Sequence, residues 1–185
     1  APLDLFAGAS SIETFRLSLR RYFAGKGFNE AVTASLAHPG QLALVGDTID
    51  PVRLKNPLSP DFSVMRTTLL PGLLKVVGWN VNRNNLDLRI FEVGTVFENT
   101  GAGKLPHETE MAGCVLTGRR FPHQWAGGNG DFDLHWARGF AEALFSVFCS
   151  GEMRVLPGPA GYTFTAGNRP LGHLMAVAPK MARAF

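Results

Sequence analysis

Apolar residues recur at helical spacing near the start of the chain, and arginines fall mostly on the other side of the same segment. The apolar positions are Ile12, Phe15, Leu19, Tyr22 and Phe23. Ser10 and Glu13 have the spacing of a capping box, in which a hydroxyl and a carboxylate satisfy free backbone N–H groups. Glycines at 25 and 27 favour a stop, so the pattern predicts a helix from residue 11 to 25.

The stretch that follows has strand and loop character. Val32 and Thr33 favour extended backbone, whereas Pro57 and Pro60 mark a turn-rich loop. The predicted segments are a strand at 28–36, a loop at 38–51 with a weak strand at 42–45, a short strand at 52–54 and a loop at 56–61.

A second helix and a long hairpin are predicted in the middle of the chain. Pro71 suits the first turn of this helix, and the apolar stripe ends at Trp79 after Leu69, Leu73, Val76 and Val77. Apolar and polar residues then alternate in a strand at 86–98, and a glycine-containing turn leads to a return strand at 110–118. Gly94 inside the first strand indicates a bulge or a close backbone approach.

The last third of the chain predicts a helix followed by short strands. The helix covers 132–148, the strands cover 153–156, 162–166 and 171–177, and a final helical turn begins near Pro179. Long hairpins without regular strand–helix alternation favour an α+β fold with a mainly antiparallel sheet flanked by helices. The last strands are expected to complete this sheet, and residues 1–185 are expected to form a single domain.

Composition places the chain among globular proteins and adds little about partners. Hydrophobic residues make up 45% and charged residues 18%, and the net charge is +3. The arginines at 16, 20 and 21 are interpreted as a solvated helix face, with a phosphate site as the alternative. Cys114 and Cys149 are predicted to be buried thiols in a reducing, cytoplasmic setting. No segment predicts a signal peptide or a membrane span.

A search for reaction chemistry finds no convincing centre. The segment 101–104 resembles part of a phosphate loop but lacks the required glycine and hydroxyl residue, so it is interpreted as a hairpin turn. The five histidines have no metal-binding spacing, and no metal site is predicted. Glu92 and Glu98 have the chemistry of acid–base groups, although surface or ion-paired carboxylates are the favoured interpretation.

Several motifs together resemble the beta subunit of bacterial phenylalanyl-tRNA synthetase. The segments that carry this resemblance are 56–59 (NPLS), 65–74 (MRTTLLPGLL), 80–83 (NVNR) and 88–97 (LRIFEVGTVF). Weaker matches lie at 28–33, 132–139, 171–174 and 178–185. The chain departs from the family at 159–162, which reads PAGY where the family usually has HPGR.

The resemblance implies a class II synthetase-like fold and a place in an (αβ)₂ heterotetramer. It also implies that the alpha subunit carries the ATP, magnesium and phenylalanine chemistry, and that tRNA is bound by the whole enzyme. A class II site needs an arginine in an Arg-x-Glu arrangement, which Arg89 and Glu92 match loosely, and a second arginine from a Gly-x-Gly-x-x-x-Arg helix. The second motif is missing, since Leu134 stands where its arginine would be. No catalytic residue and no cofactor are therefore predicted in this chain.

Two main functional hypotheses remain open, and a third, tRNA binding by this piece itself, rests only on the net charge of +3 and scattered arginines. The first is a non-catalytic module that packs against the alpha subunit, with interface residues predicted at Phe15, Leu19, Tyr22, Phe23, Asn56, Pro57 and Arg66. The second is a regulatory domain with a residual nucleotide or amino-acid pocket lined by Arg66, Arg89 and Glu92. Because the chain lacks an initial methionine and stops inside or at the edge of a predicted helix, it is expected to be a piece of a longer beta subunit.

Overall fold

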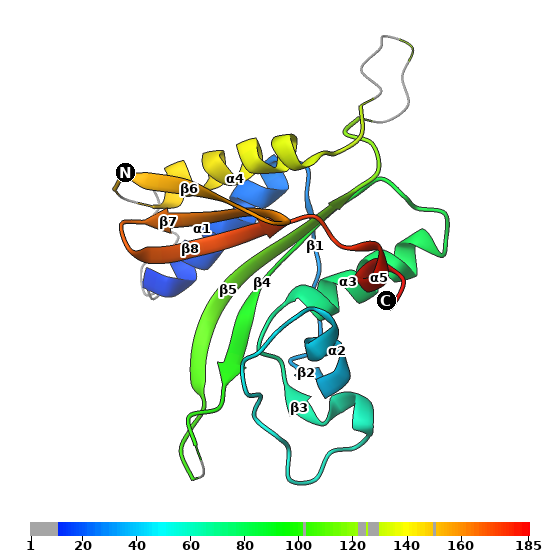
Figure 1. Cartoon of the computed structure of the whole chain (residues 1–185), viewed down its shortest axis with the longest axis vertical. Coiled ribbons are helices and arrows are strands. Elements are labelled where there is room, and N and C mark those ends of the chain that lie inside the picture. The colour runs from blue at the N-terminus through cyan, green and yellow to red at the C-terminus, as the bar shows by residue number, and fades with distance from the viewer. Residues whose placement is uncertain (1–10, 102, 122–124, 126–129, 150) are drawn as a thin grey trace, which may run out of the picture. The chain divides into compact units, whose positions relative to one another are not determined.

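The computed structural model describes residues 11–101, 103–121, 125, 130–149 and 151–185, which divide into two compact units. Unit 1 contains the described residues up to 85, residues 89–115 and residues 184–185. Unit 2 contains residues 86–88 and 116–183. The elements are labelled in Figure 1.

Unit 1 begins with the predicted helix, α1 (Ser11–Gly25). Leu19 and Phe23 are its buried residues, and the ring of Phe23 stacks on Phe91 with 4.6 Å between centroids. Phe28 packs edge-on against Phe23 at 5.3 Å, so three aromatic rings form the centre of the core. Apolar periodicity therefore identified this helix correctly, because one stripe of it is buried.

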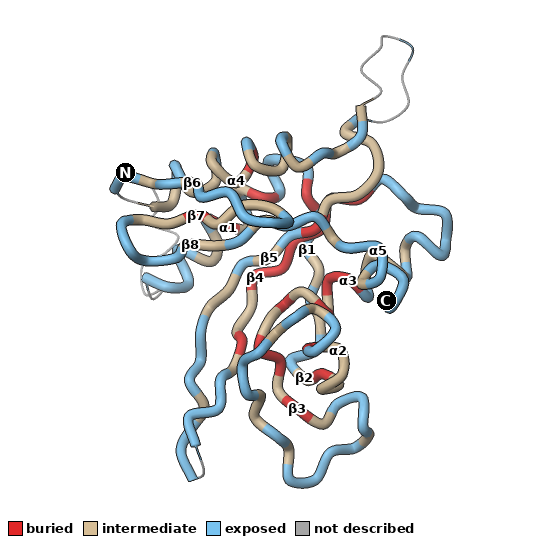
Figure 2. The backbone as a smooth tube through the Cα atoms, viewed as in Figure 1, coloured by how far each residue is buried: buried red, intermediate tan, exposed pale blue. Residues whose placement is uncertain are grey.

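The sheet of unit 1 has the order β1 (Asn29–Glu30), β4 (Leu88–Glu98) and β5 (His107–Thr117). The short strand β1 runs parallel to β4, whereas β4 and β5 are joined by the predicted hairpin turn. Within that turn the N–H of Lys104 donates to the carbonyl oxygen of Gly101, in agreement with the hairpin interpretation. Figure 2 shows buried backbone along β4, where Ile90 to Val93 are all buried.

A second pair of strands and two short helices lie beside this sheet. The strands β2 (Leu36–Ala37) and β3 (Val64–Met65) pair antiparallel. The short helices are α2 (Pro39–Leu44) and the 3₁₀ helix η1 (Pro60–Phe62). Ala37, Leu42 and Val64 form a small buried cluster that fixes α2 on the strands.

Two predictions in this region were wrong, and a third was only partly right. Residues 28–36 are not one strand, because the backbone between β1 and β2 bonds to side chains and distant segments; the N–H of Thr33, for example, donates to Glu92. The weak strand at 42–45 falls largely in α2, whose N-terminus is capped by the His38 side chain accepting from the N–H of Gly40 at 2.9 Å. The predicted strand at 52–54 is reduced to one bridge between Arg53 and Val64.

The helix α3 (Leu70–Val81) confirms the second helix prediction, with Pro71 in its first turn. Its buried side consists of Pro71, Leu73 and Leu74. Leu73 lies against β5, where a Cβ added to Gly113 would come within 3.1 Å of the Leu73 side chain. The other end of the apolar stripe is open, since Trp79 is 58% exposed.

Unit 2 packs α4 (Leu134–Phe148) on an antiparallel sheet of β6 (Met153–Gly158), β7 (Gly161–Ala166) and β8 (Arg169–Met175). Asp133 caps α4 by accepting from the N–H of Trp136 at 2.6 Å. Phe145 reaches the buried Phe164 at 5.1 Å and covers Gly172, where an added Cβ would meet its ring at 3.0 Å. The short helix α5 (Pro179–Ala182) follows β8.

The helix and strands predicted for the last third are thus present, and the mainly antiparallel α+β class is confirmed. The strands do not complete one sheet, however, because β6, β7 and β8 bond only to one another within the described residues. Whether residues 1–185 act as a single domain stays a prediction.

Other predictions have mixed outcomes. Cys114 is exposed on β5, so its prediction as a buried thiol was wrong; Cys149 is half-buried. The capping role of Ser10 and the loop glycines 127 and 128 lie outside the described residues. Among the described helices, none has both the length and the apolar character needed to cross a membrane.

Candidate functional site

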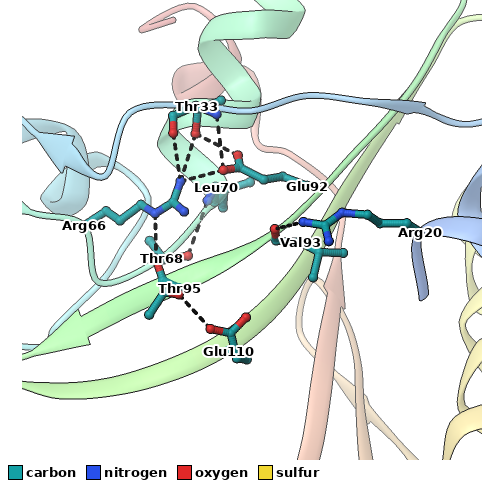
Figure 3. A network of polar contacts seen from close by, with 9 residues as sticks. All are labelled: Arg20, Thr33, Arg66, Thr68, Leu70, Glu92, Val93, Thr95 and Glu110. Carbon is teal, nitrogen blue, oxygen red and sulfur yellow. Dashed lines mark hydrogen bonds and ion pairs between the residues drawn. The ribbon is translucent and has the colours of Figure 1, made fainter. Parts of the chain in front are cut away.

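Three segments of unit 1 that are distant in sequence meet at one buried polar cluster, shown in Figure 3. Thr33 follows β1, Arg66 follows β3, and Glu92 and Thr95 belong to β4. We call these four residues the Arg66 clamp. The side chains of Arg66 and Glu92 are 8% and 3% exposed, so the clamp is nearly removed from water.

The guanidinium of Arg66 contacts every other member of the clamp. Its Nη1 donates to Glu92 Oε1 at 2.6 Å and to Thr33 Oγ1 at 3.1 Å, and its Nε donates to the carbonyl oxygen of Thr95 at 2.9 Å. A buried cation is stable only when it is paired and hydrogen-bonded. Arg66 meets both conditions, because Glu92 neutralises its charge and Thr33 and Thr95 accept its hydrogens.

Thr33 donates two further hydrogen bonds to the Glu92 carboxylate. Its hydroxyl donates to Glu92 Oε2 at 2.7 Å, and its backbone N–H donates to Glu92 Oε1 at 3.2 Å. The segment after β1 is therefore held by a side chain of β4 in place of a continued strand ladder. This explains why the predicted strand at 28–36 is interrupted.

Two glycines make room for the clamp. A Cβ at Gly94 would lie 2.4 Å from Arg66 Nη2, and a Cβ at Gly72 would lie 2.3 Å from Thr33 Oγ1. Separations below 3.0 Å between a carbon and these atoms require one of them to move. Gly94 thus marks a close approach, one of the two roles that its position in the strand predicted.

A second, partly exposed ion pair connects the clamp region to α1. Thr95 Oγ1 donates to Glu110 Oε1 at 2.7 Å, and Arg16 Nε donates to Glu110 Oε2 at 2.8 Å. The hydrogen bond from Arg16 is the main reason that the pKa of Glu110 lies below its ordinary value of 4.5, and the bond from Thr95 lowers it further. Arg20 likewise forms an ion pair with Glu30 at 2.6 Å. Arg16 and Arg20 therefore both bind carboxylates of the protein itself.

The lowered pKa of Glu110 predicts a pH-dependent contribution to stability. A carboxylate whose folded pKa is depressed contributes stability above its unfolded pKa, and that contribution is lost as the pH falls through the folded value. In the variant Arg16→Gln, we expect a loss of up to about 1 kcal/mol at pH 7, since the pair is partly solvated. The difference from wild type should vanish below the folded pKa of Glu110.

Denaturant titrations of both proteins between pH 7 and pH 2.5 measure this difference. A difference in the free energy of unfolding that stays constant over the whole pH range would contradict the assignment to Glu110. Only protonation of the carboxylate that pairs with Arg16 makes this difference disappear.

A hollow of about 260 Å³ adjoins the clamp within unit 1. Its lining combines apolar side chains with a few polar groups: Val32, Thr33, Ala34, Leu36, Ala37, Gln41, Phe62, Arg66, Thr68, Pro71, Gly72, Lys75 and Val76. The Oε1 atom of Gln41 is buried and has no hydrogen-bond donor within reach among the described residues. The hollow is therefore mostly apolar, with one unsatisfied acceptor in its wall.

The structure brings together two of the three residues predicted to line a residual pocket. Arg66 and Glu92 pair with each other, and Arg66 also lines the hollow. Arg89 lies elsewhere, because residues an odd number of positions apart face opposite sides of a strand. Its Nη1 donates to the carbonyl oxygen of Lys26 after the end of α1, at 3.2 Å.

The predicted interface residues are distributed between core and surface. Leu19 and Phe23 are buried in unit 1, Tyr22 is half-buried, and Phe15 is 46% exposed on α1. Asn56 and Pro57 are exposed in the loop before η1 and are separate from the clamp. A role for any of them in a subunit interface stays a prediction.

Sequence reasoning missed Thr33 and Gln41 as members of this site. Thr33 was interpreted only as a strand former, although its hydroxyl is the link between Arg66 and Glu92. Gln41 lies in a segment predicted as loop. The available signal was the His38-Pro39 pair, because a side-chain acceptor followed by proline is typical of a helix start.

The chemistry of the site is that of a structural clamp. The charges of Arg66 and Glu92 cancel, and both groups are committed to partners inside the protein. Among the described residues, no group of His, Cys, Asp and Glu has the arrangement of a metal site. The arrangement orders three segments and shapes the wall of the hollow.

Comparisons with known proteins agree on one family. Residues 5–185 match the family model of the phenylalanyl tRNA synthetase beta chain CLM domain. A phenylalanine–tRNA ligase beta subunit of Syntrophus aciditrophicus is 41% identical over 133 residues, which is 69% of this chain and 16% of that protein. The corresponding subunit of Pseudomonas putida is 33% identical over 184 residues, or 91% of this chain and 22% of its own length. The chain thus spans about a fifth of these relatives.

Solved structures agree on the fold. Two structures of a pyrrolysyl-tRNA synthetase from Desulfitobacterium hafniense superpose with TM-scores of 0.61 and 0.64. They cover 87% and 88% of this chain and 55% and 58% of their own chains, at 19% sequence identity. The likeness confirms the synthetase-like α+β fold predicted from the sequence.

Proposed function

This chain belongs to the phenylalanyl-tRNA synthetase beta chain family through its CLM domain, and from that membership we propose that it is a non-catalytic module that supports tRNA aminoacylation by packing against the catalytic alpha subunit. The whole enzyme is proposed to be an (αβ)₂ heterotetramer in the cytoplasm. Its alpha subunit would hold ATP, magnesium and phenylalanine, and tRNA would be bound by the complete assembly.

One observation carries the non-catalytic part of the proposal. Transfer of an aminoacyl group through an adenylate requires cations that face the phosphates and stabilise their developing charge. Arg66 is buried against Glu92 instead, and Arg89 bonds to the backbone after α1. The two arginines that offered a residual phosphate site are therefore directed at protein groups.

The packing part of the proposal is supported by surface composition. Unit 1 exposes large apolar side chains on α3, on η1 and on the segment after β1: Val32 is 89%, Trp79 58% and Phe62 42% exposed. Apolar groups gathered around a hollow favour a protein interaction site. A module that pairs Arg66 and Glu92 internally and exposes Val32, Trp79 and Phe62 suits docking better than catalysis.

The alternative, a regulatory domain with a residual nucleotide or amino-acid pocket, is favoured by the hollow that Arg66 lines. A small ligand there would contact one already neutralised cation and mostly apolar walls. That chemistry is poor for a triphosphate, so the docking function is the stronger proposal.

The test is to mix the 185-residue chain with the alpha subunit of the same organism and to measure the mass of the product by light scattering after gel filtration. Full-length beta subunit serves as the positive control, and circular dichroism verifies that the isolated chain is folded. A stable complex of the chain with alpha is expected, together with no heat of binding for ATP or phenylalanine on the chain alone. A folded chain that binds ATP or phenylalanine and ignores alpha would overturn the proposal.

A further inference from the structure

We propose that the hollow beside the Arg66 clamp receives one aromatic side chain of the alpha subunit, and that this side chain carries a hydrogen-bond donor, as tyrosine and tryptophan do. The proposal rests on the proposed docking function and specifies where on unit 1 the contact is anchored. The size of the hollow, its unsatisfied acceptor, its apolar rim and its rigidity support this assignment.

The hollow has the size and lining for a single large side chain. Its volume is about 260 Å³, and its walls are mainly apolar, with contributions from Leu36, Phe62, Pro71 and Val76. Pockets for complete small-molecule ligands are usually about 300–1,000 Å³. The hollow lies just below that range, and pockets filled by one aromatic anchor are typical energetic centres of protein contacts.

The unsatisfied Gln41 oxygen indicates what the occupant must supply. A buried acceptor without a donor costs about 1–3 kcal/mol, so a bound group that donates to it removes this cost. Rotation about the last torsion of glutamine is broad, and it can turn the amide oxygen toward the hollow. Tyrosine and tryptophan combine an apolar body with a single O–H or N–H donor, which matches apolar walls with one acceptor.

The rim of the hollow favours a protein over a free small molecule. A second hollow of similar size is lined by Lys75, Val76 and Trp79 and therefore shares two residues with the first. Trp79 is held in place by Arg83, whose guanidinium lies 3.6 Å from the centroid of its ring. A small ligand would leave Trp79 and Val32 exposed to water, whereas a partner surface would cover them together with the hollow.

The clamp holds the wall of the hollow rigid, so the hollow is a preorganised binding pocket. Thr33 and Arg66 belong to both the clamp and the wall, and Gly72 lies so close to Thr33 that no side chain fits between them. Binding to a rigid pocket avoids the entropy cost of ordering it. Lys75, exposed at the rim, adds a positive charge, so we expect a carboxylate beside the aromatic residue of alpha.

The test uses full-length beta subunit and measures its dissociation constant for alpha. Val76→Arg fills the hollow with a charged side chain and is expected to weaken binding at least about tenfold, the effect of losing a hot-spot contact. The control is Val147→Arg on α4, where a valine of unit 2 is 62% exposed, more than the half-buried Val76, and does not line the hollow. It is expected to leave the affinity within about twofold, as peripheral surface changes do.

Two further variants keep the test decisive if Val76→Arg is unstable. Gln41→Met keeps the volume and removes the acceptor, so it should weaken binding roughly three- to tenfold by leaving the donor of alpha unpaired. Lys75→Glu reverses an exposed charge and should weaken binding in a salt-dependent manner. Melting temperatures of all variants verify folding.

Each outcome decides the matter. Unchanged affinity in folded Val76→Arg and Gln41→Met would overturn the proposal while leaving docking elsewhere on the chain intact. Equal losses in Val76→Arg and Val147→Arg would also overturn it. A beta–beta dimer that Val76→Arg disperses would show that the hollow holds a second copy of this chain. If the wild-type 185-residue chain fails to bind the alpha subunit at all, the proposed function itself is wrong.

Discussion

Replacing Arg66 by methionine is expected to lower the free energy of unfolding by about 3–5 kcal/mol, because it leaves the Glu92 carboxylate buried without its counter-charge. Methionine fills a similar volume, so the change removes charge and hydrogen bonds without opening a large cavity. Glu92 would retain only the two hydrogen bonds from Thr33. Urea denaturation followed by circular dichroism measures the loss.

A second variant separates the buried charge from the packing. In Arg66→Met/Glu92→Gln, the glutamine oxygen can still accept from the N–H of Thr33, and its amide can donate to the Thr33 hydroxyl. We expect this double variant to be more stable than Arg66→Met by about 1–3 kcal/mol, because no uncompensated charge remains. A double variant that is no more stable than Arg66→Met would contradict the role of the charge pair.

The matched control removes an exposed arginine. Arg154 is 65% exposed and lies 3.8 Å from the carboxylate of Glu152. Arg154→Met is expected to change the stability by less than about 1 kcal/mol, the usual value of an exposed ion pair. A loss comparable to that of Arg66→Met would mean that burial does not explain the difference.

The regular part of the fold could be predicted because its signals are local. The helices α1, α3 and α4 and the strand β4 each carry an apolar stripe or alternation that the sequence displays directly. Helix α2 was missed because Gly40 is a poor helix former and its cap is a histidine, whose acceptor role depends on geometry. The length of strand β1 was overestimated because the segment after it bonds to a side chain of β4 and does not continue the strand.

The candidate site could be predicted only in part, because its contacts join residues that are distant in sequence. The sequence singled out Arg66, Glu92 and Gly94 through their motifs, and it offered an ion pair as one role for Glu92. It could not show that Arg66 pairs with Glu92, because 26 positions separate them and only the fold brings β3 and β4 together. Nothing in the strand pattern near Thr33 indicated that its hydroxyl would join the two charges.

The motifs that resemble the family acquire a physical meaning from this geometry. In the segment 65–74, Arg66 supplies the cation, and Gly72 provides the space that Thr33 requires. In the segment 88–97, Glu92 supplies the anion, and Gly94 provides the space that the guanidinium requires. These residues are therefore coupled through one structure, and a change in one alters what the others contribute.

This coupling leads to the second large prediction. Gly94→Ala places a Cβ 2.4 Å from Arg66 Nη2 and 3.4 Å from Glu92 Oε1, so the guanidinium must leave its position. We expect a loss of about 2–4 kcal/mol, between the cost of overpacking a core and that of breaking a buried ion pair. Gly25→Ala is the matched control, since nothing lies within 4 Å of the Cβ it would add. It should change the stability by no more than about 1 kcal/mol, the scale of glycine-to-alanine effects in helices.

The decisive comparison introduces Gly94→Ala into the Arg66→Met protein. Methionine ends short of the Nη2 position, so the added methyl group meets no guanidinium and should cost less than about 1.5 kcal/mol in that background. The two substitutions are then strongly non-additive, as expected for residues in direct contact, with a coupling energy of about 1–3 kcal/mol. Additive losses would show that Gly94 is needed for the backbone of β4 alone. Non-additive losses would establish that glycine is needed at position 94 because the guanidinium of Arg66 occupies the space beside it.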